Sequence, residues 1–115
     1  MPYKQFTDAN QPPPLVTVII VNYNGGAMVC RCLAALGQQQ FQNFITVVVD
    51  NNSIDDSVSA IFQKYPAVKV LALKINIGFA GGVNHALREC RLGPLVALLN
   101  PDAFPSSDWL KNLVA

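Results

Sequence analysis

Hydrophobic residues gather in four short runs along the chain, and each run leads into a polar or glycine-containing segment. The runs are rich in Val, Ile and Leu, and uninterrupted apolar runs of this kind are typical of strands buried on both faces of a parallel sheet. We expect the last run to form a central strand that stops before Pro101, which cannot donate a ladder hydrogen bond. The four predicted strands cover residues 16–21, 44–49, 68–73 and 95–99.

Apolar residues recur at helical spacing after each run, which predicts four helices. In the first helix Met28, Cys32 and Leu36 fall on one face, and before the second helix Ser53 and Asp56 resemble a capping box. Strict alternation of strands and helices favours right-handed βαβ units, and therefore an α/β fold with three layers and a mainly parallel sheet. The predicted helices cover residues 27–36, 54–65 and 83–91, and a last one follows residues 105–108.

The length of 115 residues suits one domain, with residues 1–14 as a polar N-terminal tail. Only 13% of the residues are charged and the net charge is +1, so we expect no nucleic-acid partner. The three cysteines, Cys30, Cys32 and Cys90, show no metal-ligand spacing and suit reduced, buried thiols. No apolar stretch is long enough to span a membrane and the first residues do not resemble a signal peptide, so we expect a cytoplasmic location.

Polar side chains follow three of the predicted strands, and a glycine-rich segment follows the other. Because parallel strands end at one edge of a sheet, these segments should meet where α/β sheets bind ligands. Asn and Asp offer the donors and acceptors that a nucleobase and a ribose need, and glycines allow the backbone to approach a ligand closely. Each segment also has a plain alternative as a turn, a helix cap or a packing contact. The candidate residues are Asn22, Tyr23, Asn24, Asp50, Asn51, Asn76, Gly78, Gly82, Asn100 and Asp102.

Four blocks in this order resemble the family 2 glycosyltransferases, and the rhamnosyltransferase-like group is the most similar subset. The resemblance implies a GT-A fold, a nucleotide-diphospho-sugar donor of the UDP or dTDP type, and a divalent metal, Mg²⁺ or Mn²⁺. It also implies an inverting transfer to a saccharide or lipid-linked acceptor, in the synthesis of a cell-envelope polysaccharide at the inner face of the membrane. The blocks span residues 14–24, 48–55, 76–84 and 98–103.

By the same resemblance, the first polar segment would surround the nucleobase and Asp50 would accept from the base or ribose, with Asn51 beside it. The segment from Asn76 to Gly82 would cover the nucleotide. Asp102 stands at the second position of the family's Asp-x-Asp motif, as ligand of the metal and diphosphate. This sequence departs from the motif at its first position, where Asn100 is a weaker cation ligand.

The resemblance assigns residues 15–115 to the nucleotide-sugar-binding part of the enzyme, with no catalytic base among them. We therefore expect the chain alone to be inactive, and an exposed sheet edge to favour a homodimer. A non-catalytic module that binds nucleotide or a partner is the alternative. A nucleotidyltransferase-like enzyme is a third hypothesis, but the loop at residues 22–26 lacks the basic residue expected of it.

Overall fold

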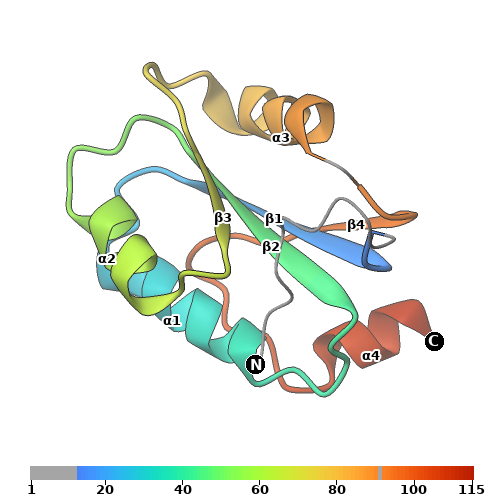
Figure 1. Ribbon diagram of the computed structural model, residues 1–115. Helices are drawn as coiled ribbons and strands as arrows, with labels where there is room; N and C mark the ends of the chain where they lie inside the picture. Colours follow the sequence, from blue (N-terminus) through green and yellow to red (C-terminus); the bar gives the residue numbers. More distant parts are fainter. Residues whose placement is uncertain (1–12, 91) are drawn as a thin grey trace.

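The structure is a computed structural model that describes residues 13–90 and 92–115. Four parallel strands form one sheet in the order β3-β2-β1-β4, so the predicted parallel sheet is confirmed (Figure 1). The predicted tail at residues 1–14 lies mostly outside the described residues. The strands are β1 (Val16–Asn22), β2 (Phe44–Asp50), β3 (Lys69–Ala72) and β4 (Leu95–Leu98).

Helices cover both faces of the sheet and give the three layers expected from the sequence. One face carries α3 alone, and the other carries α1, α2 and α4 (Figure 1). No helix among the described residues is both long and apolar enough to cross a membrane. The helices are α1 (Gly26–Gly37), α2 (Ser57–Lys64), α3 (Gly78–Glu89) and α4 (Trp109–Val114).

Alternation of side chains along the two central strands builds a separate core on each face. In β1, Val18 and Ile20 pack with the cluster under α1, whereas Ile19 packs with the cluster under α3. Every residue of β1 and β2 is buried, as the apolar runs predicted. The same alternation continues past the end of β2, where Asp50 contacts the loop before α2 and Asn51 contacts the loop before α3.

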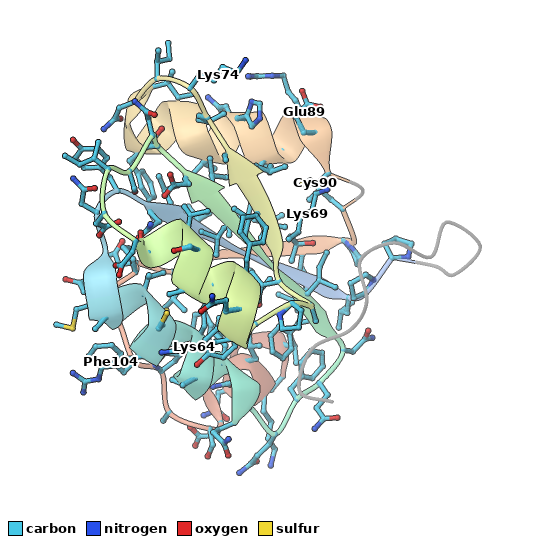
Figure 2. The ribbon with its side chains drawn as sticks, turned by 60° about the vertical axis from the view of Figure 1, so that its left-hand side comes forward. Lys64, Lys69, Lys74, Glu89, Cys90 and Phe104 are labelled. Atoms are coloured by element: carbon cyan, nitrogen blue, oxygen red, sulfur yellow. The ribbon has the colours of Figure 1, made fainter. Side chains whose placement is uncertain are left out.

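Cys30 and Cys32 lie in α1 and Cys90 at the end of α3, and all three are free thiols, of which only Cys32 is fully buried. Cys32 belongs to the core under α1, whereas Cys90 packs at the end of α3 near Lys69, as Figure 2 shows. Burial raises the pKa of Cys90, and the charge of Lys69 opposes that rise. Because the sheet separates these two thiols, they do not form a pair.

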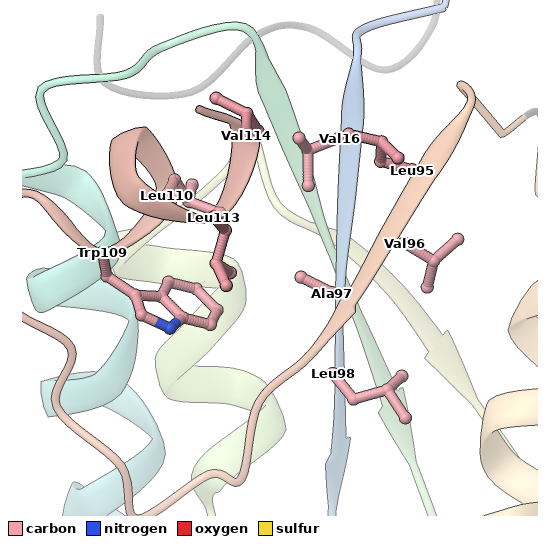
Figure 3. Close-up of a pocket in the computed structure, with 9 residues that line it drawn as sticks. All are labelled: Val16, Leu95, Val96, Ala97, Leu98, Trp109, Leu110, Leu113 and Val114. Atoms are coloured by element: carbon pink, nitrogen blue, oxygen red, sulfur yellow. The ribbon is translucent and has the colours of Figure 1, made fainter.

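The prediction of a central, doubly buried last strand was wrong. In the described part of the chain β4 lies at the edge of the sheet and pairs with β1 alone, which leaves Leu95, Val96 and Leu98 exposed. An apolar groove of about 470 Å³ runs between this strand and α4, with Trp109 and Leu113 on its other side (Figure 3). The apolar composition of the run reports strand propensity, and it does not report how many neighbours the strand has.

Three helix predictions also need correction. The helix expected at residues 54–65 begins at Ser57, and Ser53 forms no capping box because its hydroxyl donates to Asp50. The helix expected from residue 83 begins at Gly78, so the glycine segment is largely helical. The buried face of α1 includes Val29 and Leu33, whereas Met28 is exposed.

Candidate functional site

The polar ends of β1 and β2 meet at the carboxyl edge of the sheet. Asn22 and Asp50 are register partners, and their exposed fractions are 0% and 3%. The Asn22 side-chain amide donates to Asp50 Oδ1 at 2.9 Å. A buried carboxylate is stable only when its oxygens are hydrogen-bonded, so this contact anchors the edge.

Ser53 supplies two more hydrogen bonds to the same carboxylate. Its backbone N–H donates to Asp50 Oδ2 at 2.9 Å, and its hydroxyl donates to Oδ1 at 2.7 Å. The hydroxyl oxygen also accepts from the backbone N–H of Asn24 at 2.8 Å. A second bond joins the same loops, because the Asn24 side-chain oxygen accepts from the backbone N–H of Ile54 at 2.9 Å. The loops that follow β1 and β2 are therefore tied together.

Ser57 and Asp55 extend these contacts to the first turns of two helices. The Ser57 hydroxyl accepts from the Asn22 amide at 3.0 Å and donates to Asp55 Oδ1 at 2.6 Å. Asp55 Oδ2 accepts from the backbone N–H of Gly26, so one carboxylate caps the starts of both α1 and α2. We call this set the rim network; its members are Asn22, Asn24, Asp50, Ser53, Asp55 and Ser57.

Replacing Asp55 by Asn should lower the free energy of unfolding near neutral pH by about 1 kcal/mol, the usual value of one hydrogen bond, because an amide nitrogen replaces one of the two oxygens that accept from the helix starts. The hydrogen bond from Ser57 is the main cause that lowers the pKa of Asp55 below its ordinary value. A lowered pKa stabilises the fold above the unfolded-state pKa of about 4, and this contribution is lost as the pH falls through the folded-state pKa.

Urea unfolding from about pH 7 to about pH 3 measures this linkage. The difference between wild type and Asp55→Asn should shrink as the pH falls. Asp56→Asn is the matched control, because Asp56 makes no side-chain capping bond to α2. A constant difference across the whole range would contradict a capping role for the Asp55 carboxylate.

Asn51 points to the opposite face and holds the loop between β3 and α3. Its amide donates to the carbonyl oxygen of Gly78 at 3.0 Å, and its side-chain oxygen accepts from the N–H of Ile77 at 3.2 Å. In the same loop the Asn76 side-chain oxygen accepts from the N–H of Gly78, which has a φ of +80°. Asp50 and Asn51, which are consecutive at the end of β2, thus hold loops on opposite faces of the sheet.

The candidate residues divide into buried and exposed groups. Tyr23 is 53% exposed, and Asn76, Asn100 and Asp102 are also exposed. Gly82 is buried in α3, where a Cβ would lie 3.0 Å from a Val21 methyl group. Gly82 thus brings the helix close to β1, which is the packing alternative for that glycine.

Asp102 lies beyond β4 in a segment that packs on α1. The Cys32 thiol donates to the carbonyl oxygen of Asn100 at 3.6 Å, and burial followed by the charge of Asp102 raises the pKa of Cys32 to about 12. No hydrogen bond joins Asp102 to the rim network in the described residues. The described residues include no group of three or more His, Cys, Asp or Glu side chains that could hold a metal ion. A single carboxylate still fits a cation such as Mg²⁺, which takes most of its ligands from water and substrate phosphates.

Sequence reasoning missed Asp55, Ser57 and Gly25 as members or neighbours of this site. The spacing of serine and aspartate over residues 53–57 was visible in the sequence, but it was interpreted as a helix start. Packing requires a glycine at position 25, because a Cβ at that position would overlap Asn22 Oδ1. The buried Oδ1 atom has no hydrogen-bond partner among the described residues. It occupies the space that the missing side chain of Gly25 leaves open.

Replacing Gly25 by Ala should lower the free energy of unfolding by about 1–3 kcal/mol, the usual cost of overpacking, because Asn22 must move. Gly26→Ala is the matched comparison in the same loop. Its Cβ meets nothing within 4 Å, so its cost of about 1 kcal/mol comes from the φ of +56° alone. In urea unfolding of both variants, an equal or smaller loss for Gly25→Ala would contradict the overlap with Asn22.

Several known proteins are similar to this chain in sequence or in structure. An N-acetylglucosaminyl-diphospho-decaprenol L-rhamnosyltransferase of Mycobacterium tuberculosis is 29% identical over 75 residues, which are 65% of this chain and 24% of that protein. The crystal structure of S. aureus TarS 1-349 in complex with UDP superposes with a TM-score of 0.77 and 28% identity, covering 86% of this chain and 30% of TarS.

The mannosyltransferase PcManGT from Pyrobaculum calidifontis, in complex with GDP-Man and Mn²⁺, gives a TM-score of 0.76 and 30% identity over 96% of this chain and 35% of its own. The chain therefore spans about a quarter to a third of the length of these relatives. The α/β sheet matches GT-A glycosyltransferase structures, which confirms the fold expected from the resemblance. The profile described as Glycosyl transferase family 2 matches residues 17–115. Because this match covers nearly the whole length of the 115-residue chain, the chain belongs to glycosyl transferase family 2.

Proposed function

We propose that residues 15–115 form the part of an inverting glycosyltransferase that binds a nucleotide-diphospho-sugar, of the UDP or dTDP type. The observation that carries the proposal is the rim network, which ties the loops after β1 and β2 around the buried Asp50 carboxylate. Asn51 adds the loop before α3 to the same edge. Loops at the carboxyl edge of a parallel sheet are the usual ligand-binding position of such folds.

Two similar structures support a nucleotide-sugar donor. The TarS structure is a complex with UDP, and the PcManGT structure is a complex with GDP-Man and Mn²⁺. In our proposal the exposed Tyr23 ring contacts the nucleobase, together with Asn24, and Asp50 accepts a hydrogen bond from the base or ribose. Asn22, predicted to lie around the nucleobase, is fully buried and instead holds the Asp50 carboxylate. The segment from Asn76 to Gly82 covers the nucleotide.

Asn100 and Asp102 occupy the diphosphate end of the proposed site. The Asn100 amide is a donor for ribose or phosphate oxygens, and the exposed Asp102 carboxylate would hold Mg²⁺ or Mn²⁺. The bound cation would neutralise the negative charge that the diphosphate carries and gains as it leaves. The chain's own contribution is to orient the donor, so that its anomeric carbon faces the acceptor hydroxyl in line.

We propose no catalytic base within these 115 residues, and we expect no sugar transfer by this chain alone. The proposed acceptor is a saccharide or lipid-linked sugar of a cell-envelope polysaccharide, handled in the cytoplasm at the inner face of the membrane. The rhamnosyltransferase relative, whose name includes a diphospho-decaprenol, supports this class of acceptor. A non-catalytic nucleotide-binding module remains the competing function.

Calorimetry with UDP and dTDP, in Mn²⁺ and in chelator, tests the donor site. We expect weak binding that strengthens when Mn²⁺ is present. A transfer assay with UDP- and dTDP-sugars and a lipid-linked acceptor then compares this chain with the full product of its gene. Turnover by a form longer than these 115 residues supports the enzyme, whereas nucleotide binding without turnover by any form supports the module. Absence of nucleotide binding in every condition would contradict both functions.

We also propose that two copies of this chain associate through the apolar groove between β4 and α4. Leu95, Val96 and Leu98 are 44%, 41% and 49% exposed along an edge strand, and such edges favour pairing with another chain. Val96→Lys should shift the chain toward monomer in sedimentation equilibrium, because a lysine on an edge strand opposes pairing. Lys111→Glu is the control for a charge change on exposed α4 surface. A monomeric wild type at high concentration would contradict this association.

A further inference from the structure

We propose that Arg31 is a positioning residue for Asp102, the carboxylate that would hold the cation of the donor. The inference rests on the proposed function, because the role of Asp102 is part of it. In this role Arg31 touches neither the cation nor the nucleotide. It acts through the Phe104 ring beside α1, whose centroid lies 4.5 Å from the carbon of the Arg31 guanidinium group (Figure 2).

Asp102 lies on a segment that is neither helix nor strand. Residues 99–108 form turns and irregular backbone between β4 and α4. Asp102 belongs to a turn that is closed by the N–H of Ala103, which donates to the carbonyl oxygen of Asn100 at 3.1 Å. Because the Asp102 side chain is exposed, packing does not fix it. Its position therefore depends on the contacts that hold the two sides of this turn.

Two consecutive residues of α1 hold the two sides of the turn. On the side before Asp102, the Cys32 thiol donates to the carbonyl oxygen of Asn100 at 3.6 Å. On the side after Asp102, the Arg31 guanidinium group covers the Phe104 ring. The cation–π contact is the stronger of the two, since a thiol is a weak hydrogen-bond donor. Because both contacts start from one rigid helix, they fix the two sides of the turn relative to each other.

The chain after the turn is anchored separately, near the end of α1. Gln39 is 4% exposed, and its amide donates to the carbonyl oxygen of Ser106 at 2.7 Å. Its side-chain oxygen accepts from the N–H of Leu110 at 3.1 Å. These bonds hold the start of α4, whereas the cation–π contact lies two residues from Asp102. Loss of the Arg31 side chain should therefore loosen the turn while α4 keeps its place.

A held turn matters because the cation needs the Asp102 carboxylate in one place. Ordering a mobile segment when a ligand binds costs conformational entropy, and a contact that orders it beforehand removes that cost. Loss of the Arg31 contact should therefore weaken the part of nucleotide binding that depends on the cation. Binding in chelator should not change, since the proposed role of Asp102 is to hold the cation.

The experiment measures the affinity of UDP in Mn²⁺ and in chelator by calorimetry, for the same preparation of each protein. In Arg31→Ala the ratio of the two affinities should fall by about two- to fivefold, the usual effect of one exposed cation–π contact. Phe104→Leu removes the other half of the contact and should lower the ratio equally, whereas Phe104→Tyr keeps a ring and should keep the ratio. Lys64→Ala is the matched control, because Lys64 lines the same groove between α1 and α2 as Arg31 and carries the same charge.

Both side chains of the contact are exposed, so the variants should fold, and the ratio does not depend on the folded fraction. An unchanged ratio in Arg31→Ala or in Phe104→Leu would overturn the positioning role while leaving the donor site intact. An equal loss of affinity in Mn²⁺ and in chelator would also overturn it, because Arg31 would then act on the nucleotide itself. If wild type binds no UDP, or binds it without any dependence on Mn²⁺, the proposed donor or cation site is overturned, and this inference with it.

Discussion

Replacing Asp50 by Ala should weaken UDP binding by about ten- to a hundredfold, with Mn²⁺ or with chelator. The proposed partner of this carboxylate is the base or ribose, so the loss should not depend on the cation. The variant also removes the acceptor of the Asn22 amide and of both Ser53 donors. Because buried donors without partners are costly, the free energy of unfolding should fall by about 2 kcal/mol.

Asp50→Asn separates the two effects in calorimetry and urea unfolding. It keeps the shape of the side chain and one oxygen, but it replaces an acceptor by a donor. Asp56→Asn is the control, because it removes the same charge from an exposed position in the same loop. If Asp50→Asn stays folded and binds UDP as tightly as wild type, then Asp50 serves the fold alone.

Replacing Asp102 by Asn should abolish most of the strengthening of UDP binding by Mn²⁺ while leaving the fold unchanged. The carboxylate is exposed and lies beyond β4, so the free energy of unfolding should change by less than about 0.5 kcal/mol. An amide is a poorer ligand than a carboxylate for hard divalent cations, and the only other motif side chain is already the Asn100 amide.

Calorimetry of wild type and Asp102→Asn, with Mn²⁺ and with chelator, measures this effect. Asp108→Asn is the matched control, because Asp108 is an exposed carboxylate that accepts from the Ser106 hydroxyl at the start of α4. If Asp102→Asn retains the full dependence on Mn²⁺, then Asp102 is a turn residue and the cation is held elsewhere.

The layers of the fold followed from the sequence because periodicity and composition report burial. β1 and β2 lie under helices on both faces, and each was visible as a run of branched apolar residues. The position of β4 could not be obtained in this way. An apolar run has the same composition whether it lies at the centre or at the edge of the described sheet.

The sequence predicted where in the fold the polar segments lie, but it did not predict how their side chains contact one another. The sequence placed Asn22, Asp50 and Asn51 at the carboxyl edge, since each follows an apolar run. It did not show that alternation sends Asp50 toward Ser53 and Asn51 toward Gly78, because that depends on where β2 ends. The strand was expected to end before Asp50, and it includes this residue.

The sequence also did not predict where the helices α2 and α3 begin. Ser53 and Asp56 match a capping pattern, yet the Ser53 hydroxyl donates to the buried Asp50 carboxylate. Local rules describe what a residue does for its own helix, and they do not show that the Ser53 hydroxyl also accepts from the backbone N–H of Asn24 in a distant part of the chain. Long-range contacts of this kind, such as Asp55 with Gly26, need the folded structure to be seen.

The most direct test of the donor site is to map which backbone amides change when UDP and Mn²⁺ bind. In ¹H–¹⁵N correlation spectra of the isotope-labelled chain, we predict shifts in residues 22–26, 51–57, 76–82 and 100–103. The amino edge of the sheet, at residues 42–44 and 93–95, should not change. Shifts confined to the amino edge or to the groove beside β4, or no saturable shifts at all, would contradict a nucleotide site at the carboxyl edge.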